Sequence, residues 1–162
     1  MAKPATDVGP GAELELSSAE REVLAEEVEA FAQTLKDPDA RERYAHLSVA
    51  VQQGTVPPHL VGFLETMLEL ILPTQRVRRQ HGPDAEQALL RLFHRTPRGS
   101  ALAQAAREVN TALEALHGHT LESLTFTPTP RGHNLVVETA HCSLTLAIDR
   151  AGVRVERMET GV

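Results

Sequence analysis

The sequence predicts an α+β fold, in which an N-terminal layer of about five helices is followed by a C-terminal four-stranded antiparallel β-meander packed on the helices. Apolar residues recur at spacings of three and four between residues 17 and 118, which is typical of amphipathic helices. Between residues 121 and 159 they alternate with polar residues, as in strands with one buried face. Short turn sequences separate the alternating segments, so the simplest topology pairs each strand with the next.

Capping signals predict the first two helices. Ser17 and Glu20 have the spacing of a capping box, in which each side chain binds the backbone N–H of the other residue. Asp37 followed by Pro38 ends this helix and starts the next one, because Asp is a good N-cap and Pro fits the first helical position. The second helix is expected to end at Gly54.

Three further helices are expected before the strands. Residues 60–72 are apolar around most of a helix circumference, which predicts a position at the centre of the fold or in an oligomer. Pro73 should end or kink this helix, leaving residues 74–81 as a bent continuation or a basic loop. A fourth helix should start at Asp84, and Ser100 should cap a fifth. Its apolar stripe is Leu102, Ala106, Val109, Leu113 and Leu116. The third or fifth helix is the natural cover for the sheet.

Length and composition predict one domain without a membrane segment. Residues 14–162 are expected to form a single α+β domain with its helical part at 17–118 and its β part at 121–159, and residues 1–13 a disordered lead. Cys142 is the only cysteine, so an intrachain disulfide is impossible and a reducing compartment, the cytoplasm, is expected. Glu65 and Glu69 interrupt the longest apolar stretch, which is too short to span a bilayer.

The charge pattern gives the best indication of a partner. Between residues 73 and 98, six arginines stand against two acidic residues, within a chain of net charge −6. The candidate partner- or anion-binding residues are Arg76, Arg78, Arg79, Arg91, Arg95 and Arg98. Arginine without lysine suits bidentate pairing with carboxylates, which favours an acidic protein surface. Residues 11–72 hold twelve acidic and four basic side chains, so the acidic helices of the same chain are a further candidate.

Metal-binding and catalytic signals are weaker. His117, His119, His141 and Cys142 are candidate metal ligands, but the chain lacks a CxxC or HExxH pattern. Cys142 falls on the apolar parity of its strand, which favours a buried hydrophobic role over that of a nucleophile. Glu65 and Glu69 could form an acid/base pair or simply the exposed stripe of a buried helix. No nucleotide-binding motif is present, and no cofactor is predicted.

The tetrapeptide Thr-Pro-Arg-Gly occurs twice, at residues 96–99 and 129–132. Pro and Gly at this spacing are common turn chemistry, so a chance recurrence is the simpler interpretation. The functional interpretation would place Arg98 and Arg131 on one edge of the domain, where they would form a cationic rim with His94 and His133.

Three classes of function follow from these patterns. The first is a non-enzymatic cytoplasmic interaction module, an adaptor, regulator or assembly factor that recognises acidic groups and self-associates through residues 60–72 or 102–116. The second is an anion or nucleic-acid binder, which the net charge of −6 and the low aromatic content of 3% oppose. The third is an enzyme or metal protein built on the histidines and Cys142.

Overall fold

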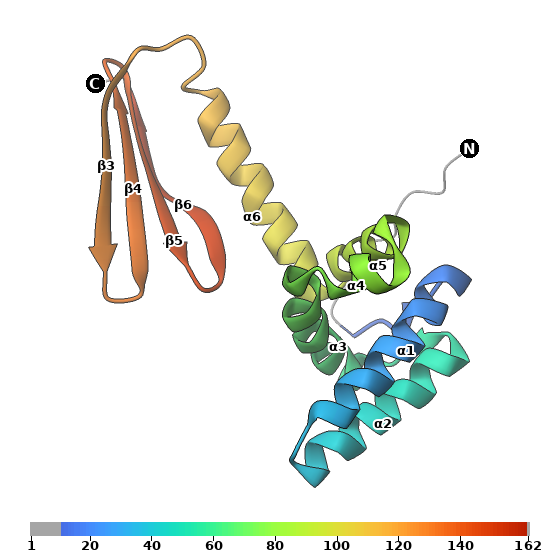
Figure 1. Cartoon of the computed structure of the whole chain (residues 1–162). Helices are drawn as coiled ribbons and strands as arrows, with labels where there is room; N and C mark the ends of the chain where they lie inside the picture. The colour runs from blue at the N-terminus through green and yellow to red at the C-terminus, as the bar shows by residue number, and fades with distance from the viewer. Residues whose placement is uncertain (1–10, 162) are drawn as a thin grey trace, which may run out of the picture. The chain divides into compact units, whose positions relative to one another are not determined.

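The computed structural model describes residues 11–161 and confirms the predicted α+β order (Figure 1). Most of the predicted disordered lead therefore lies outside the described residues. The chain forms two compact units, one up to Ser100 and one from Ala101 onward.

The first unit is helical. Its helices are α1 (Ser18–Thr34), α2 (Pro38–Gln53), α3 (Pro58–Ile71), a 3₁₀ turn (Leu72–Thr74), α4 (Arg76–His81) and α5 (Pro83–Arg95). Ser17 and Glu20 form the predicted capping box, and Asp37 caps α2 by accepting from the backbone N–H of Asp39 at 3.1 Å. Two short strands that the sequence did not reveal, β1 (Leu14–Glu15) and β2 (Thr55–Val56), pair with each other.

The core of this unit is formed by apolar faces of α1, α2, α3 and α5. On α3, the side chains of Leu64, Met67 and Leu68 are completely buried, whereas Leu70 remains 57% exposed. The central position predicted for residues 60–72 is therefore confirmed within this unit. Tyr44, the chain's only tyrosine, is also buried here, and its hydroxyl donates to the carbonyl of Phe63 at 3.1 Å.

Residues 74–81 form neither a continuation of α3 nor a loop. The 3₁₀ turn that contains Pro73 ends at Gln75, whose φ of 57° lies in the left-handed region. This residue reverses the local backbone, and the short helix α4 begins immediately after it. Val77 anchors α4 in the core with 1% exposure, which leaves the neighbouring arginines of α4 at the surface.

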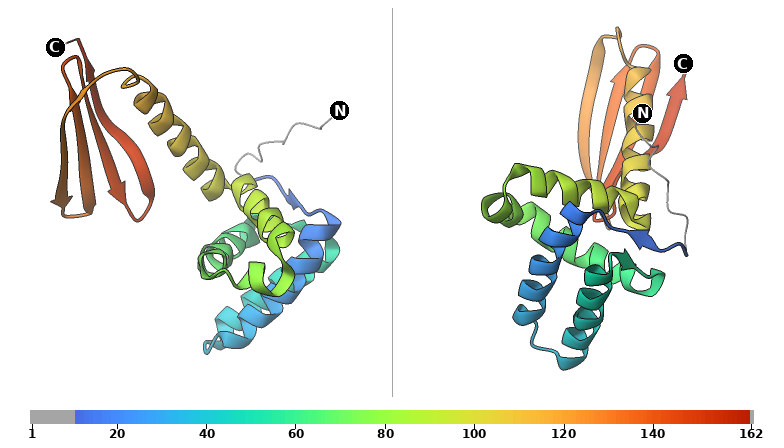
Figure 2. Two further views of the ribbon diagram at one scale, coloured as in Figure 1. Left: turned by 45° about the horizontal axis from the view of Figure 1, so that its top comes forward. Right: turned by 90° about the vertical axis from the view of Figure 1, so that its right-hand side faces the viewer.

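The second unit consists of most of α6 (Pro97–Glu114) and one antiparallel sheet. The strands are β3 (Leu121–Thr129), β4 (Gly132–Thr139), β5 (Cys142–Asp149) and β6 (Gly152–Thr160), in the order β3-β4-β5-β6. This is the predicted meander. Val109 and Ala112 of α6 pack on Val137, Leu144 and Leu146, so the fifth predicted helix covers the sheet (Figure 2).

Two details of α6 differ from the prediction. The helix begins at Pro97 instead of being capped by Ser100, because Thr96 is the N-cap and its hydroxyl oxygen accepts from the backbone N–H of Gly99 at 3.2 Å. The stripe that faces the sheet also differs, since Ala112 is buried and Leu113 is 41% exposed. Ala112 therefore belongs to the face of α6 that packs on the sheet, and Leu113 does not.

The two Thr-Pro-Arg-Gly copies adopt related local contacts in different elements. Thr96 starts α6, whereas Thr129 ends β3, and each threonine oxygen accepts from the N–H of the glycine three residues later, at 3.2 and 3.1 Å. Both glycines lie against backbone, because a Cβ on Gly99 would sit 1.8 Å from a carbonyl oxygen and one on Gly132 would sit 2.1 Å from another. At both places, glycine allows the chain to pass close to a neighbouring backbone carbonyl.

Candidate functional site

The six candidate arginines lie on α4, on α5 and in the first turn of α6, all within the first unit. The structure divides them into two groups. Arg76, Arg95 and Arg98 contact carboxylates on α1 and α3. The side chains of Arg78, Arg79 and Arg91 are directed to solvent or make contacts within their own segment.

The strongest contact joins Arg95 to Glu20. The Arg95 Nη2 atom lies 2.9 Å from Oε1 and 2.8 Å from Oε2 of Glu20, while Nη1 donates to the carbonyl of Glu15 at 3.0 Å. Only 9% of the Glu20 side chain is exposed, and the same carboxylate accepts from the backbone N–H of Ser17 at 2.8 Å. Arg95 therefore joins α5 to the start of α1.

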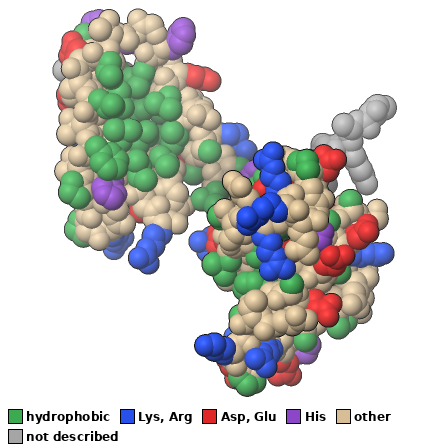
Figure 3. Space-filling model, viewed as in Figure 1, with side chains coloured by type: hydrophobic (Ala, Val, Ile, Leu, Met, Phe, Trp, Pro, Cys, Tyr) green, Lys and Arg blue, Asp and Glu red, His purple; other side chains and the backbone are tan. Residues whose placement is uncertain are grey.

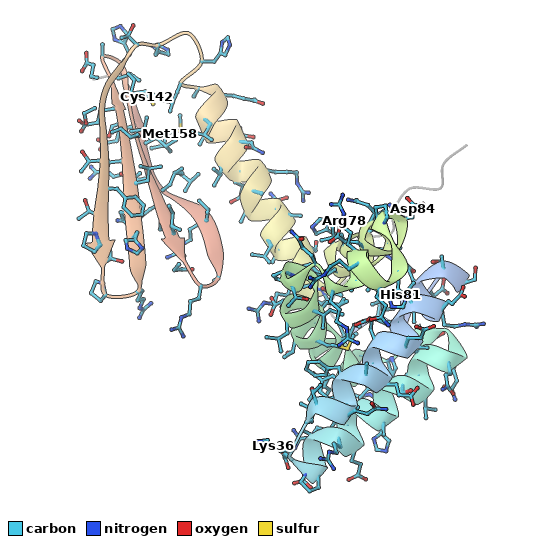
Figure 4. All side chains as sticks on the ribbon, in the orientation of Figure 1. Lys36, Arg78, His81, Asp84, Cys142 and Met158 are labelled. Carbon is cyan, nitrogen blue, oxygen red and sulfur yellow. The ribbon has the colours of Figure 1, made fainter. Side chains whose placement is uncertain are left out.

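A second contact centres on Glu27, a carboxylate on α1 with only 1% exposure. Its Oε1 atom lies 3.1 Å from the Nε2 atom of His81, at the end of α4 (Figure 4). Its Oε2 atom lies 3.7 Å from Nε of Arg76 and has no hydrogen-bond partner among residues 11–161. Glu20 and Glu27 therefore bear out the candidate pairing of the arginines with the acidic helices of the same chain.

Arg98 contacts both glutamates of α3. Its backbone N–H donates to Oε1 of Glu65 at 2.8 Å, and its Nε atom contacts Glu69. Glu65 thus binds one of the unpaired N–H groups in the first turn of α6, where a negative charge also complements the helix dipole. Both carboxylates have structural contacts, so the acid/base interpretation receives no support from the geometry.

Three arginines remain for a partner. Arg78 is 60% exposed and lies 3.8 Å from Glu86, and Arg79 donates to the carbonyl of Thr74 at 3.2 Å. Within residues 11–161, Arg91 is exposed and has neither an ionic nor a hydrogen-bonded partner. Basic side chains gather on the surface of this unit (Figure 3). Of the two arginines one turn apart on α5, Arg95 binds Glu20 and Arg91 remains available to a partner.

The candidate metal ligands come together only in part. The rings of His119 and His141 lie 5.8 Å apart, centroid to centroid, at 72°. His117 is exposed after α6, and Cys142 is buried in β5 with 4% exposure. Among the described residues, no three His, Cys, Asp or Glu side chains are placed to hold a metal ion.

An open groove of about 670 Å³ lies between α1 and α2. Its lining mixes apolar and polar side chains, including Val28, Ala32, Tyr44, Gln33 and Arg41. The Arg41 Nε atom already donates to the carbonyl that follows α1, at 2.5 Å. The groove thus offers a surface without an evident reactive group.

The most exposed apolar surface was missed by sequence reasoning. Leu121, Leu124 and Phe126 are 52%, 61% and 58% exposed, and we call these three residues the β3 strip. Alternation predicted Leu124 and Phe126 on a buried face, and the register does place them on the face that α6 covers, opposite Val137 and Leu135. The bulge before Ser123 keeps Leu121 on the same face.

The β3 strip is exposed because α6 does not reach β3. The apolar cluster under α6 includes residues of β4, β5 and β6, but no residue of β3. Figure 3 shows apolar side chains gathered on this sheet. His133 stacks on the Phe126 ring at 4.8 Å and 14°, which covers only part of that ring. A pattern of alternation shows which face is apolar, but not how far a covering helix extends.

β6, the strand at the other edge of the sheet, is charged and irregular. β6 has an irregularity in its pairing at Glu156, between Val155 and Arg157. Arg154 contacts Asp149 across the turn, and this hydrogen bond lowers the pKa of the Asp149 carboxyl below its usual value. Charges and a bulge are the devices by which natural sheets protect an edge.

Within the described part of the chain, no helix has the length and apolar character needed to cross a membrane. In comparisons with known proteins, the chain matches no family model, no curated protein and no solved structure.

Proposed function

We propose that the chain is a non-enzymatic, cytoplasmic protein-interaction module, an adaptor, regulator or assembly factor, and that the β3 strip is its main contact surface. The observation that carries this proposal is the exposure of three large apolar side chains in succession along one edge strand. Single exposed apolar residues are ordinary, whereas the largest contiguous apolar patch on a folded surface is often functional.

The arginines support a second, electrostatic part of the same function. Arg78, Arg79 and Arg91 are exposed on α4 and α5 and would recognise acidic groups of a protein partner. Because Arg76, Arg95 and Arg98 already contact carboxylates of their own chain, fewer cations remain for a polyanion. This distribution weakens the nucleic-acid alternative, since affinity for nucleic acid depends on the number of phosphates neutralised.

The candidate catalytic groups also support a non-enzymatic role. Glu65 and Glu69 bind Arg98, and the Cys142 thiol is buried in the sheet. Each side chain thus has a structural use in the described fold.

The test is affinity capture from a native lysate with three forms of the chain. The wild type and Leu70→Ser should capture the same partner, whereas Leu124→Ser should lose it. Leu70 is a matched control because it is 57% exposed, close to the 61% of Leu124, but lies outside the β3 strip on α3. Equal capture by all three forms, or none by any form, would refute the role of the strip.

The arginine contribution is measured with the same partner. Arg91→Ala should weaken capture, and added salt should weaken it further, because exposed charges are screened. Retention on heparin at low salt that is lost in Arg91→Ala would instead favour the nucleic-acid alternative.

A further inference from the structure

We propose that β3 is a dimerisation strand, through which two copies of this chain pair edge to edge and antiparallel. The proposal rests on the proposed function, because it names a second copy as the partner that binds along β3 and contacts the β3 strip from the side. It differs from self-association through residues 60–72 or 102–116.

The two edges of the sheet differ in charge and in regularity. β3 and β6 are the edge strands. β6 carries Arg154, Glu156, Arg157 and Glu159 and is irregular at Glu156. From Ser123 to Thr127, β3 carries no charge. Unpaired backbone groups on an uncharged edge are a template for another strand, while charges and bulges prevent such pairing.

The sequence of β3 is complementary to itself in an antiparallel pair. An antiparallel pair centred on Thr125 places Leu124 of each copy opposite Phe126 of the other copy, on the apolar face. Aliphatic and aromatic side chains in such cross-strand positions stabilise a sheet. The same register places Thr125 opposite Thr125 on the polar face and separates the two Glu122 carboxylates to opposite ends of the pair.

Association through β3 stops at two copies. A pair related by a twofold axis uses the β3 edge of both molecules, so that only β6 edges remain at the ends of the joined sheet. Pro128 limits the pairing at one end of β3, because proline has no backbone N–H to donate. The combined structure therefore has a closed contact and two protected edges.

Charge does not oppose this contact. The second unit, from Ala101 to Val162, holds seven acidic and five basic side chains, a net charge of −2. Glu122 is the only charged residue in β3 itself. Two copies can thus approach through β3 without strong repulsion between like charges.

The size of the surface predicts a weak dimer. Three side chains that are more than half exposed offer about 100 Å² each, or about 300 Å² of apolar surface per copy. This amount lies well below the area of a standard stable interface, even after the strand backbone is added. The dimer is therefore expected to form with a dissociation constant in the micromolar range or weaker.

The test is sedimentation equilibrium of the purified full chain over a wide concentration range. The wild type should change from monomer to dimer, and Leu124→Lys and Phe126→Lys should each weaken dimerisation by at least about tenfold, because each removes the apolar cross-strand contact between Leu124 and Phe126 at both of its symmetric positions. The control is Leu70→Lys, at an exposed position of α3 outside the β3 strip, and this variant should dimerise like the wild type. Circular dichroism should show unchanged secondary structure for all three variants.

Hydrogen–deuterium exchange of the wild type provides a second measurement that needs no variant. Backbone amides of β3 should exchange more slowly at high than at low protein concentration, while those of β6 should not change. Unchanged exchange in β3 despite dimerisation, or a dimer that Leu113→Lys abolishes and Leu124→Lys does not, would overturn the proposal.

The two proposals can fail separately. A wild type that stays monomeric at every concentration, but captures a lysate partner only when Leu124 is intact, would overturn the dimer and leave the interaction module. A monomer without a captured partner would remove both.

Discussion

Replacing Arg95 by alanine should destabilise the helical unit far more than the same change at Arg91, one turn earlier on α5. Arg95 binds both oxygens of Glu20 and the carbonyl of Glu15, whereas Arg91 is exposed and has no partner among residues 11–161. The two variants remove the same side chain from the same helix. Their difference therefore isolates the contact with α1.

The expected magnitude follows from the burial of the pair. Removing one member of a fully buried ion pair costs about 3–5 kcal/mol, because the other charge is left without compensation. The Arg95 side chain is 29% exposed, and Glu20 keeps its bond from the Ser17 N–H, so solvent and the capping box offset part of this cost. We expect a loss of about 2–3 kcal/mol for Arg95→Ala and less than about 0.5 kcal/mol for Arg91→Ala.

Urea unfolding followed by far-ultraviolet circular dichroism measures both values. A double-mutant cycle with Glu20→Gln, which retains an acceptor for the Ser17 N–H, gives the coupling energy between the two side chains. If both arginine variants lose the same stability within about 0.5 kcal/mol, or if the cycle shows no coupling, Arg95 does not hold α1 and this reasoning is wrong.

Three further predictions test the packing of each unit. Gly99→Ala should lower the free energy of unfolding in urea by well over about 1 kcal/mol, because its Cβ would lie 1.8 Å from a carbonyl oxygen of α5. Gly62→Ala has open space around the site and should stabilise α3 by about 0.5–1 kcal/mol. Equal effects of the two changes would contradict the geometry. Burial raises the pKa of Tyr44 above 10.0, so its contribution to stability should be complete below pH 10 and decline as pH rises through the folded-state pKa. The absorbance of this single tyrosine measures that pKa, and Tyr44→Phe should flatten the alkaline decline. Leu144→Ala should cost about 2–5 kcal/mol, and Leu124→Ala less than about 0.5 kcal/mol, because α6 covers only the first; thermal unfolding that ranks them the other way would show that the cover lies elsewhere.

The local parts of the fold could be predicted because their signals lie within a few residues of one another. The capping box at Ser17 and the Asp37–Pro38 junction each depend on neighbours within three positions, and alternation identified all four strands of the meander. The sequence did not predict β1 and β2, because two residues are too few to show the alternation of apolar and polar side chains that identifies a strand. The start of α6 was misplaced because Thr96 and Ser100 are both suitable caps, and only the packing of Gly99 against α5 decides between them.

The candidate site was less accessible to sequence reasoning because it depends on contacts distant in the chain. The excess of arginine between residues 73 and 98 was visible, but the pairing of Arg95 with Glu20 spans 75 positions. The neighbouring sequence does not indicate that Arg95 binds a carboxylate and that Arg91 does not. Likewise, Leu124 is exposed because α6 does not cover β3. The face of α6 that packs on the sheet also differs from the predicted stripe, since Ala112 is buried and Leu113 is exposed.

The single tyrosine and the single cysteine of the chain lie in different units, so the unfolding of each unit can be measured separately. Tyr44 is buried in the first unit, and Cys142, the only thiol, is buried in the second. With no tryptophan in the chain, tyrosine fluorescence reports only on the helical unit, and the rate of thiol labelling reports only on the opening of the sheet. Coincident transitions in denaturant would identify one cooperative unit, while separate transitions would identify two, and both can be recorded on the unmodified protein.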